Sequence, residues 1–199
     1  MDDLTLHAYD HAATAFADDW DSQPAGTDLQ ELVLRHFRRP GLVADIGCGS
    51  GRDAAWLSAN GFDVVGFEPS ARLLAEARRR HPEVEFQSAA LPELANIPAE
   101  SFDNVLCETV IMHLDPRSAI EAASRLIDIV KPGGTLYLTW RVTEGEDQRD
   151  DSGRRYAVVD AAGVRTALAP AELLLDEEVT SSSSGKTIHR VIARKPQQR

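Results

Sequence analysis

The chain has 199 residues, 43% of them hydrophobic, and a formal net charge of −11. This length predicts a single domain over residues 1–199. The excess of acidic over basic residues argues against a nucleic acid as the main partner, because binding phosphates needs clustered Lys and Arg. No apolar run is long enough to span a membrane and no signal-like segment follows Met1. We therefore expect no membrane association and a cytoplasmic location.

Residues 1–39 are expected to form an N-terminal lid and a helix. The stretch 4–20 has apolar residues at mostly helical spacing, and Thr27 can cap a helix that runs to about Arg39. The apolar positions of the first stretch are Leu6, Tyr9, Ala13, Phe16 and Trp20. Because this stretch lies outside the regular core pattern, we expect it to cover the ligand end of the fold.

An apolar strand, Leu42 to Gly47, runs directly into a loop that contains Gly49 and Gly51, and then into a helix from Arg52. Glycines at such a turn let the backbone bend sharply and let a ligand approach closely. The dinucleotide fingerprint G-x-G-x-x-G would need glycine at position 52, where this chain has arginine. The loop therefore predicts a nucleotide-type cofactor and disfavours NAD.

The second apolar strand, Asp63 to Phe67, ends in Glu68, whose carboxylate can accept hydrogen bonds from both hydroxyls of a ribose. Helix and strand signals then alternate as in a doubly wound sheet. The expected helices are Arg52 to Asn60, Pro69 to His81 and Asp115 to Val130. The further expected strands are Val84 to Ser88, Asp103 to Val110, Thr135 to Trp140, and a C-terminal hairpin of Leu173 to Ser183 and Thr187 to Arg194.

Residues 141–169 form a long insert ahead of the C-terminal hairpin segment 170–199. Within the insert, Arg154 to Val159 and Val164 to Leu168 flank Asp160 to Gly163. This pattern predicts a small β-hairpin over the ligand site.

The run Asp45-Ile46-Gly47-Cys48-Gly49-Ser50-Gly51, followed by Glu68, resembles motifs I and II of the class I S-adenosylmethionine-dependent methyltransferases. Further segments resemble later motifs of that family in order and spacing. They are Phe86 to Leu94, Ser101 to Glu108, Met112 to Leu114, and Leu126 to Leu136. Gly51-Arg52-Asp53-Ala54, with the following Trp56-Leu57, is similar to the branch that includes tellurite-resistance and thiopurine-type enzymes.

The resemblance implies an α/β fold with a Rossmann-like, doubly wound, seven-stranded sheet in three α/β/α layers. The implied strand order is 3-2-1-4-5-7-6, with one antiparallel strand. It also implies a cofactor-binding core over residues 40–140 and S-adenosylmethionine as the cofactor.

By the same resemblance, the backbone of the glycine loop cradles the cofactor, Asp45 orients its methionine amine directly or through water, and Glu68 binds its ribose. The implied cofactor-binding residues are Asp45, Gly47, Cys48, Gly49, Arg52, Glu68, Pro69, Ala89, Ala90, Leu91, Glu108, Tyr9 and Trp20. Ala89 to Leu91 would line the adenine. The chain departs from the family at Gln87 and Ser88, where an acid usually contacts the adenine amino group.

Glu108 and His113 are the candidate catalytic residues, with positioning as their main role. Methyl transfer needs few catalytic side chains, because the sulfonium is already reactive and the protein has to hold the acceptor in line. His113 can take a proton near neutral pH, or it can be a hydrogen-bonded residue that closes a loop. Orienting the cofactor is the preferred role of Glu108.

The remaining candidates have two readings each. Arg52 can form a surface pair with Asp53 or face the cofactor carboxylate, and Tyr9 and Trp20 can be lid aromatics near the sulfonium or can pack on the core. The candidate substrate residues, taken from their position, are Trp140, Arg141 and Tyr156, although an arginine-rich hairpin can also be a solvated flap. No metal site is expected.

The sequence thus predicts a methyltransferase that acts on an O, N or S atom of a small molecule by direct displacement. The acid is concentrated in residues 1–28, with seven aspartates and no Lys or Arg, and in residues 144–151. If these segments border the pocket they favour a neutral or cationic acceptor, and otherwise they are solvated faces. The alternatives are a protein or peptide methyltransferase and a cofactor-binding regulatory or partner subunit without its own chemistry. The sequence leaves the oligomeric state undefined.

Overall fold

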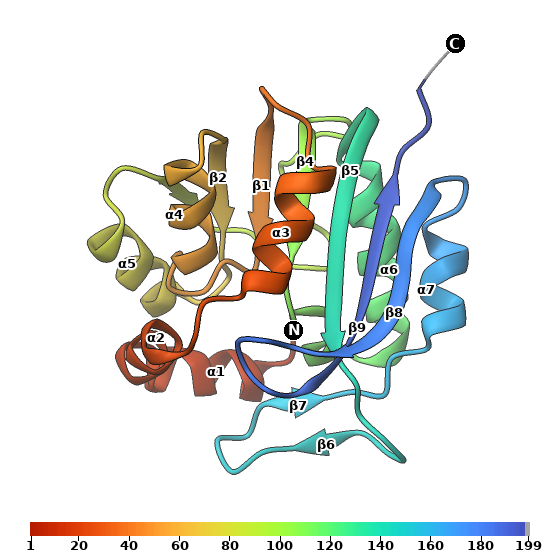
Figure 1. Ribbon diagram of the computed structural model, residues 1–199. Helices are drawn as coiled ribbons and strands as arrows, with labels where there is room; N and C mark the ends of the chain where they lie inside the picture. Colours follow the sequence, from red (N-terminus) through yellow and green to blue (C-terminus); the bar gives the residue numbers. More distant parts are fainter. Residues whose placement is uncertain (198–199) are drawn as a thin grey trace.

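The computed structural model describes residues 1–197 and contains a seven-stranded sheet in the order β3-β2-β1-β4-β5-β9-β8 (Figure 1). The strands are β1 Leu42–Ile46, β2 Asp63–Phe67, β3 Glu85–Gln87, β4 Phe102–Cys107, β5 Val130–Arg141, β8 Glu172–Thr180 and β9 Thr187–Arg194. Only β9 runs antiparallel to its neighbours, β5 and β8. The predicted order 3-2-1-4-5-7-6 is confirmed, since β8 and β9 are the sixth and seventh strands of this sheet. Residues 198 and 199, at the end of the predicted segment 170–199, lie outside the described residues.

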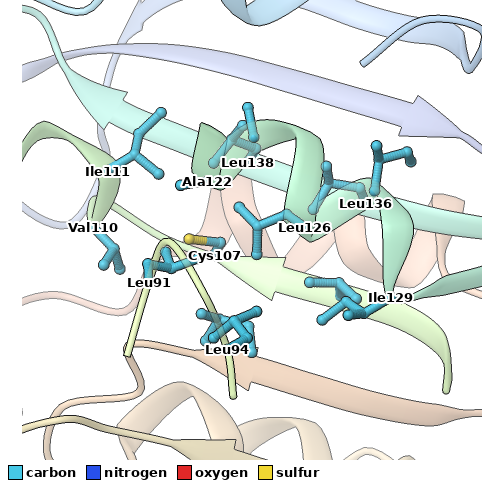
Figure 2. Close-up of a cluster of buried hydrophobic side chains, with 14 of the residues drawn as sticks. Leu91, Leu94, Cys107, Val110, Ile111, Ala122, Leu126, Ile129, Leu136 and Leu138 are labelled. Carbon is cyan, nitrogen blue, oxygen red and sulfur yellow. The ribbon is translucent and has the colours of Figure 1, made fainter. Parts of the chain in front are cut away.

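Helices cover both faces of the sheet, which gives three layers. One face carries α3 Thr27–His36, α4 Arg52–Ala59 and α5 Ala71–Arg80, and the other carries α6 Pro116–Asp128 and α7 Ala161–Ala167. Successive strand residues point to opposite faces, so Val43 packs toward α3 and α4 while Ala44 packs toward α6. Figure 2 shows Leu126 of α6 lying against Cys107 and Leu136 of the sheet. Across residues 1–197, no helix is both long and apolar enough to cross a membrane.

Side-chain caps fix where two of these helices begin. The predicted cap at Thr27 is wrong, because Thr27 is the first helical residue of α3 and the capping position is Gly26, which makes no side-chain hydrogen bond. The Asp115 side chain accepts from the backbone N–H groups of Arg117 and Ser118, and Pro116 occupies the first helical position of α6. Ser70 caps α5 in the same way by accepting from the N–H of Leu73.

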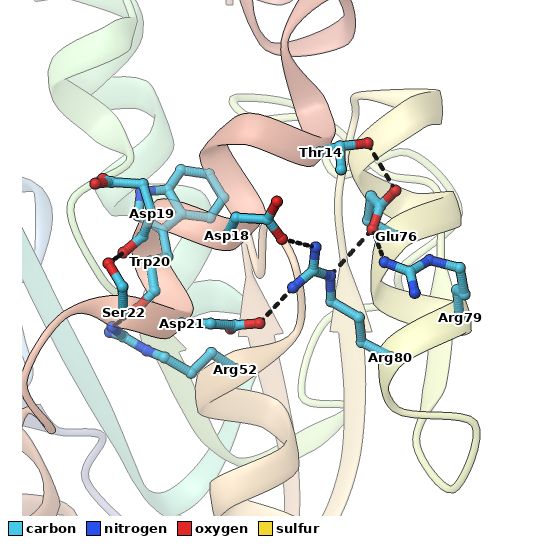
Figure 3. Close-up of polar contacts among 10 residues, drawn as sticks. All are labelled: Thr14, Asp18, Asp19, Trp20, Asp21, Ser22, Arg52, Glu76, Arg79 and Arg80. Carbon is cyan, nitrogen blue, oxygen red and sulfur yellow. Dashed lines mark hydrogen bonds and ion pairs between the residues drawn. The ribbon is translucent and has the colours of Figure 1, made fainter.

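The N-terminal lid consists of two helices, α1 Asp3–His11 and α2 Ala13–Ser22, although the pattern over residues 4–20 predicted one helical stretch. The helix is interrupted at Ala12, whose φ of −117° is not helical. Arg80 of α5 ties α2 to the core by ion pairs with Asp18 and Asp21, and it also bonds Glu76 on its own helix (Figure 3).

The insert differs from its prediction. Its hairpin consists of β6 Gln148–Arg149 and β7 Arg155–Tyr156, which are antiparallel, and the predicted second arm, Val164 to Leu168, belongs to the end of α7. Asp160 caps this helix by accepting from the N–H of Ala162 at 3.0 Å. Val164 and Leu168 are spaced four apart and are both buried, as on one face of a helix that packs against α6. The predicted strand at these residues is therefore wrong.

Candidate active site

A cavity of about 360 Å³ lies at the carboxyl ends of the parallel strands, where open α/β sheets bind ligands. The glycine loop after β1 forms one wall, and α1 and α2, the β6–β7 hairpin and the β8–β9 turn enclose the rest, at the bottom of Figure 1. The predicted site residues that line it are Tyr9, Trp20, Gly47, Cys48, Gly49, Arg52, Glu68, Pro69, Glu108, His113, Arg141 and Tyr156. Within residues 1–197, no group of three His, Cys, Asp or Glu is arranged to hold a metal ion.

The glycine loop is held tightly by the end of β2. The N–H groups of Gly47 and Cys48 both donate to the carbonyl of Phe67, at 2.7 and 3.1 Å, and the N–H of Gly49 donates to Oε2 of Glu68 at 3.0 Å. These three amides are therefore engaged within the protein and are not free to hold a ligand. Gly49 has φ +55°, and a Cβ there would lie 2.7 Å from the Trp20 ring, so the loop surface depends on glycine.

Glu68 lies between the glycine loop and α5. Its Oε1 accepts from the N–H of Ser70 at 2.9 Å, and its side chain is almost fully buried. Desolvation raises the pKa of Glu68 to about 7, although both backbone hydrogen bonds act in the opposite direction. Each carboxylate oxygen has a second lone pair, so this group fits the two hydroxyls of a ribose.

Asp45 does not line the cavity, because it lies buried behind the loop. Its Oδ2 has no hydrogen-bond partner among the described residues. Burial raises the pKa of Asp45, and the neighbouring carboxylates of Asp53, Glu68 and Glu108 raise it further. Direct contact with a cofactor amine is therefore not supported, whereas contact through water remains compatible with the structure.

The predicted adenine residues also lie away from the cavity lining. Leu91 belongs to the main hydrophobic core, Ala89 packs against that core, and Ala90 is exposed. An adenine contact at these residues stays a prediction.

Glu108 is positioned by Thr139 of β5. The Thr139 hydroxyl donates to Oε2 of Glu108 at 2.6 Å and accepts from the N–H of Thr109 at 2.9 Å. Thr109 has φ +54°, which is a strained conformation for a β-branched residue and is typical of functional sites. Desolvation raises the pKa of Glu108 to about 7.

His113 is buried at the end of the short helix η1 Ile111–His113 and bonds on both sides. Its Nδ1 lies 2.5 Å from the carbonyl of Arg155, which can only accept, so Nδ1 carries the proton. Nε2 then accepts from the hydroxyl of Tyr9 at 2.8 Å. Desolvation lowers the pKa of His113 to about 4, which keeps the ring neutral.

Three aromatic rings of the cavity surround Arg154, a residue that the sequence analysis missed. Its Cζ lies 4.5 Å from the ring centre of Phe16, 5.5 Å from that of Tyr9 and 5.8 Å from that of Tyr156. Asp150 at the start of the hairpin turn pairs with its guanidinium at 2.7 Å. No periodic pattern signals this contact, because it depends on how the hairpin folds back onto α1 and α2.

Trp140 was expected to contact the substrate, and the structure corrects this. It is 2% exposed and stacks on His189 of β9, with ring centres 4.5 Å apart. Strand residues alternate between faces, so Trp140 and Arg141 could not both reach the cavity, and only Arg141 lines it.

Arg52 and the lid aromatics pack against their neighbours and also line the cavity, and their contacts with a cofactor stay predictions. Arg52 pairs with Asp53 at 3.2 Å and donates to the carbonyl of Trp20 at 3.0 Å, while its side chain lines the cavity. Tyr9 and Trp20 line the cavity and also pack against Phe16, with ring centres 5.3 and 5.8 Å from it.

Comparison with known proteins agrees with this geometry. Residues 43–134 match the methyltransferase domain family. A ubiquinone biosynthesis O-methyltransferase of Hahella chejuensis is 35% identical over 133 residues, which cover 60% of this chain and 55% of that protein. A protein of the same description from Alkalilimnicola ehrlichii is 36% identical over 97 residues, 46% of this chain and 38% of that protein. The chain thus spans about half or less of the length of these curated relatives.

Solved structures share the fold. The 1,6-didemethyltoxoflavin-N1-methyltransferase of Burkholderia thailandensis, solved with 1,6-didemethyltoxoflavin and S-adenosylhomocysteine, has a TM-score of 0.76 and 20% identity over 98% of this chain and 88% of that one. The [4+2]-cyclase SpnF has a TM-score of 0.73 and 18% identity over 96% of this chain and 94% of that one. At these identities the likeness shows the fold alone.

The sheet order and the cavity beside a glycine loop define a Rossmann-like α/β protein with a nucleotide-type site. The matched segment narrows the class further: over residues 43–134 the chain is similar to the methyltransferase domain family of the class I S-adenosylmethionine-dependent methyltransferase superfamily. S-adenosylmethionine is the cofactor of that superfamily, and the carboxylate of Glu68 beside the glycine loop fits its ribose.

Proposed function

We propose that this protein transfers the methyl group of S-adenosylmethionine to an O, N or S atom of a small molecule by direct displacement. The observation that carries the proposal is one cavity with two kinds of wall. The loop from Gly47 to Gly49 and Glu68 form its cofactor side, and Tyr9, His113 and Tyr156 form the side left for an acceptor. Such an arrangement holds two reactants in line and excludes water, which is the main requirement of this reaction.

The roles of the polar residues follow from their bonds. Glu68 binds the ribose, and Glu108, fixed by Thr139, orients the cofactor near the reacting centre. Tyr9 receives the proton that the acceptor loses, while its own proton passes to Nε2 of His113. Because the pKa of His113 is lowered to about 4, the imidazolium formed in this way is short-lived at neutral pH and releases its proton to solvent.

The enclosure of the cavity favours a small molecule over a peptide. An acidic, groove-like rim would support a peptide methyltransferase, but Asp2 pairs with Arg149, and Asp18 pairs with Arg80. These ion pairs balance part of the N-terminal acid, whereas Asp19 lines the cavity without one among the described residues, so the charge of the acceptor stays open.

The test is S-adenosylhomocysteine formation by the purified protein from S-adenosylmethionine and a panel of phenols, amines and thiols. We expect turnover with at least one acceptor, and a loss of turnover in Tyr9→Phe that exceeds any loss of cofactor affinity. Tight cofactor binding without turnover on the whole panel would contradict the proposal and favour a regulatory or partner subunit. O-methylation is tested first, because the relatives described above are O-methyltransferases.

A further inference from the structure

Arg141 and Lys186 differ from the other basic residues of the cavity because they lack a carboxylate partner among the described residues. Arg52 pairs with Asp53 and Arg154 with Asp150, so the charge of each is balanced within the protein. Arg141 and Lys186 also line the cavity, and in the part of the chain that the structure describes no carboxylate lies within ion-pair distance of either. Arg141 is half-buried and Lys186 is exposed, and two positive charges without a counter-ion on one wall attract an anionic group.

Arg141 lies at the end of β5, directly opposite Ile188 of β9, and Lys186 precedes that position by two residues. Both Ile188 and Lys186 line the cavity, so the end of β5 and the neighbouring β8–β9 turn bring the two cations to one wall. The half-buried Arg141 side chain is held by Tyr156, whose ring centre is 5.0 Å from its Cζ. A guanidinium carries five N–H donors, so contact with one tyrosine leaves others for a ligand.

This wall adjoins the acceptor side of the cavity. The ring of Tyr156 meets that of His113 edge to face, with centres 5.1 Å apart, and His113 bonds the hydroxyl of Tyr9. Arg141 is thus one aromatic ring away from the residues that are proposed to handle the proton of the acceptor.

We infer that Arg141, assisted by Lys186, is an anion subsite that binds a carboxylate of the methyl acceptor. The inference rests on the proposed function and narrows its substrate class to small, flat molecules that carry a carboxylate. A carboxylate matches the planar fork of a guanidinium with two parallel hydrogen bonds, and the rings of Tyr156 and Tyr9 suit a flat body beside it.

The carboxylate of the cofactor itself is the competing ligand for an arginine in this cavity. Position favours Arg52 for that group even though Asp53 already pairs with it, because Arg52 begins α4 directly after the glycine loop and bonds Trp20 of the lid. Arg141 belongs to the wall with Tyr156 and His113. The two assignments predict different losses when Arg141 is replaced.

The test is calorimetric binding of matched acids and amides to protein saturated with S-adenosylhomocysteine. The probes are hydroxybenzoates, hydroxyphenylacetates and hydroxycinnamates, each with its carboxamide. In the wild type we expect at least one acid to bind about tenfold or more tightly than its amide, as for charge-assisted hydrogen bonds. Arg141→Met should abolish this preference while the affinity for S-adenosylhomocysteine stays within about twofold.

The control is Arg117→Met, which removes an equal charge from an exposed position on α6. It should keep the wild-type preference. A wild type that binds no acid better than its amide would overturn the subsite, as would a preference that survives in Arg141→Met. Loss of S-adenosylhomocysteine affinity in Arg141→Met would overturn it by assigning the arginine to the cofactor. Failure of the wild type to bind the cofactor would instead contradict the proposed function, so the two failures are distinguishable.

Discussion

The hydroxyl of Tyr9 donates a 2.8 Å hydrogen bond to Nε2 of His113, which joins the first helix of the chain to the loop after β4. The carbonyl of Arg155 fixes the tautomer of the histidine from the other side. Three segments far apart in the sequence therefore meet at one neutral, buried imidazole. Each of them also contributes to the cavity wall, so the bond connects closure of the lid to the proposed proton path.

Replacing Tyr9 with Phe tests this connection. The change removes the hydroxyl and leaves Nε2 of His113 without a donor, so we expect a stability loss of about 1–3 kcal/mol and a fall in kcat of about a hundredfold. Urea denaturation and steady-state kinetics measure the two effects. His11→Gln, on the same helix outside the cavity, is the control and should change neither. A Tyr9→Phe protein with wild-type kcat would leave the pair a purely structural role.

Replacing Glu68 with Ala should weaken cofactor binding by about 1.5–3 kcal/mol for each charge-assisted hydrogen bond that is lost. Because Glu68 also accepts from Gly49 and Ser70, the same variant should unfold at a lower urea concentration. Calorimetric titration with S-adenosylhomocysteine measures the affinity.

Glu68→Gln separates the two effects. The amide oxygen can still accept one of the backbone hydrogen bonds, so this variant should recover part of the stability and little of the affinity. Unchanged affinity in Glu68→Ala would show that the ribose binds elsewhere.

Gly49 and Gly61 form a matched pair for testing the loop. Both have positive φ, at +55° and +83°, but a Cβ at Gly49 would meet the Trp20 ring at 2.7 Å, whereas a Cβ at Gly61 would meet nothing within 4 Å. Gly61→Ala should cost only the backbone strain of about 1–2 kcal/mol. Gly49→Ala should cost more and should also reduce cofactor affinity, because the lid must shift. Equal stability losses with intact binding would show that the lid does not rest on the loop.

The stability of the ligand-free protein should fall as the pH rises toward 7. The pKa values of Glu68 and Glu108 are raised from 4.5 to about 7. At a pH between these two values the folded protein therefore holds two protons that the unfolded chain has already released. The lowered pKa of His113, about 4, acts in the opposite direction between pH 4 and 6.5. Urea midpoints measured between about pH 6.5 and pH 8 therefore report the loss of stability that comes from ionisation of Glu68 and Glu108, without the opposing contribution of His113.

Glu108→Gln provides the comparison for this pH dependence. It cannot titrate but keeps an acceptor for the Thr139 hydroxyl, so the fall in stability with pH should become shallower. An identical pH profile in the wild type and the variant would contradict a raised pKa at Glu108.

The sheet and the glycine loop could be predicted because their signals are local. Strand periodicity, the cap at Asp115, and the spacing from Gly49 to Glu68 depend on neighbours in the sequence. The hairpin of the insert was misplaced for the opposite reason. Gly163 suggested a turn, whereas packing of Val164 and Leu168 against the core made a helix.

The contents of the site were less predictable than its location. Tyr9, Glu68, His113 and Tyr156 line the cavity as expected. Arg154 and Lys186 were missed, because their places depend on how two hairpins fold over the sheet. Strand alternation places Trp140 and Arg141 on opposite faces, and the stacking of Trp140 on His189 shows which of the two is buried away from the cavity.

The most direct test of the account is a calorimetric titration of the purified protein with S-adenosylmethionine, S-adenosylhomocysteine and NAD under identical conditions. The account predicts saturable binding of the first two with a stoichiometry of about one and no response to NAD, because Arg52 replaces the third glycine of the dinucleotide fingerprint. Binding of NAD, or no binding of either sulfur compound, would contradict it.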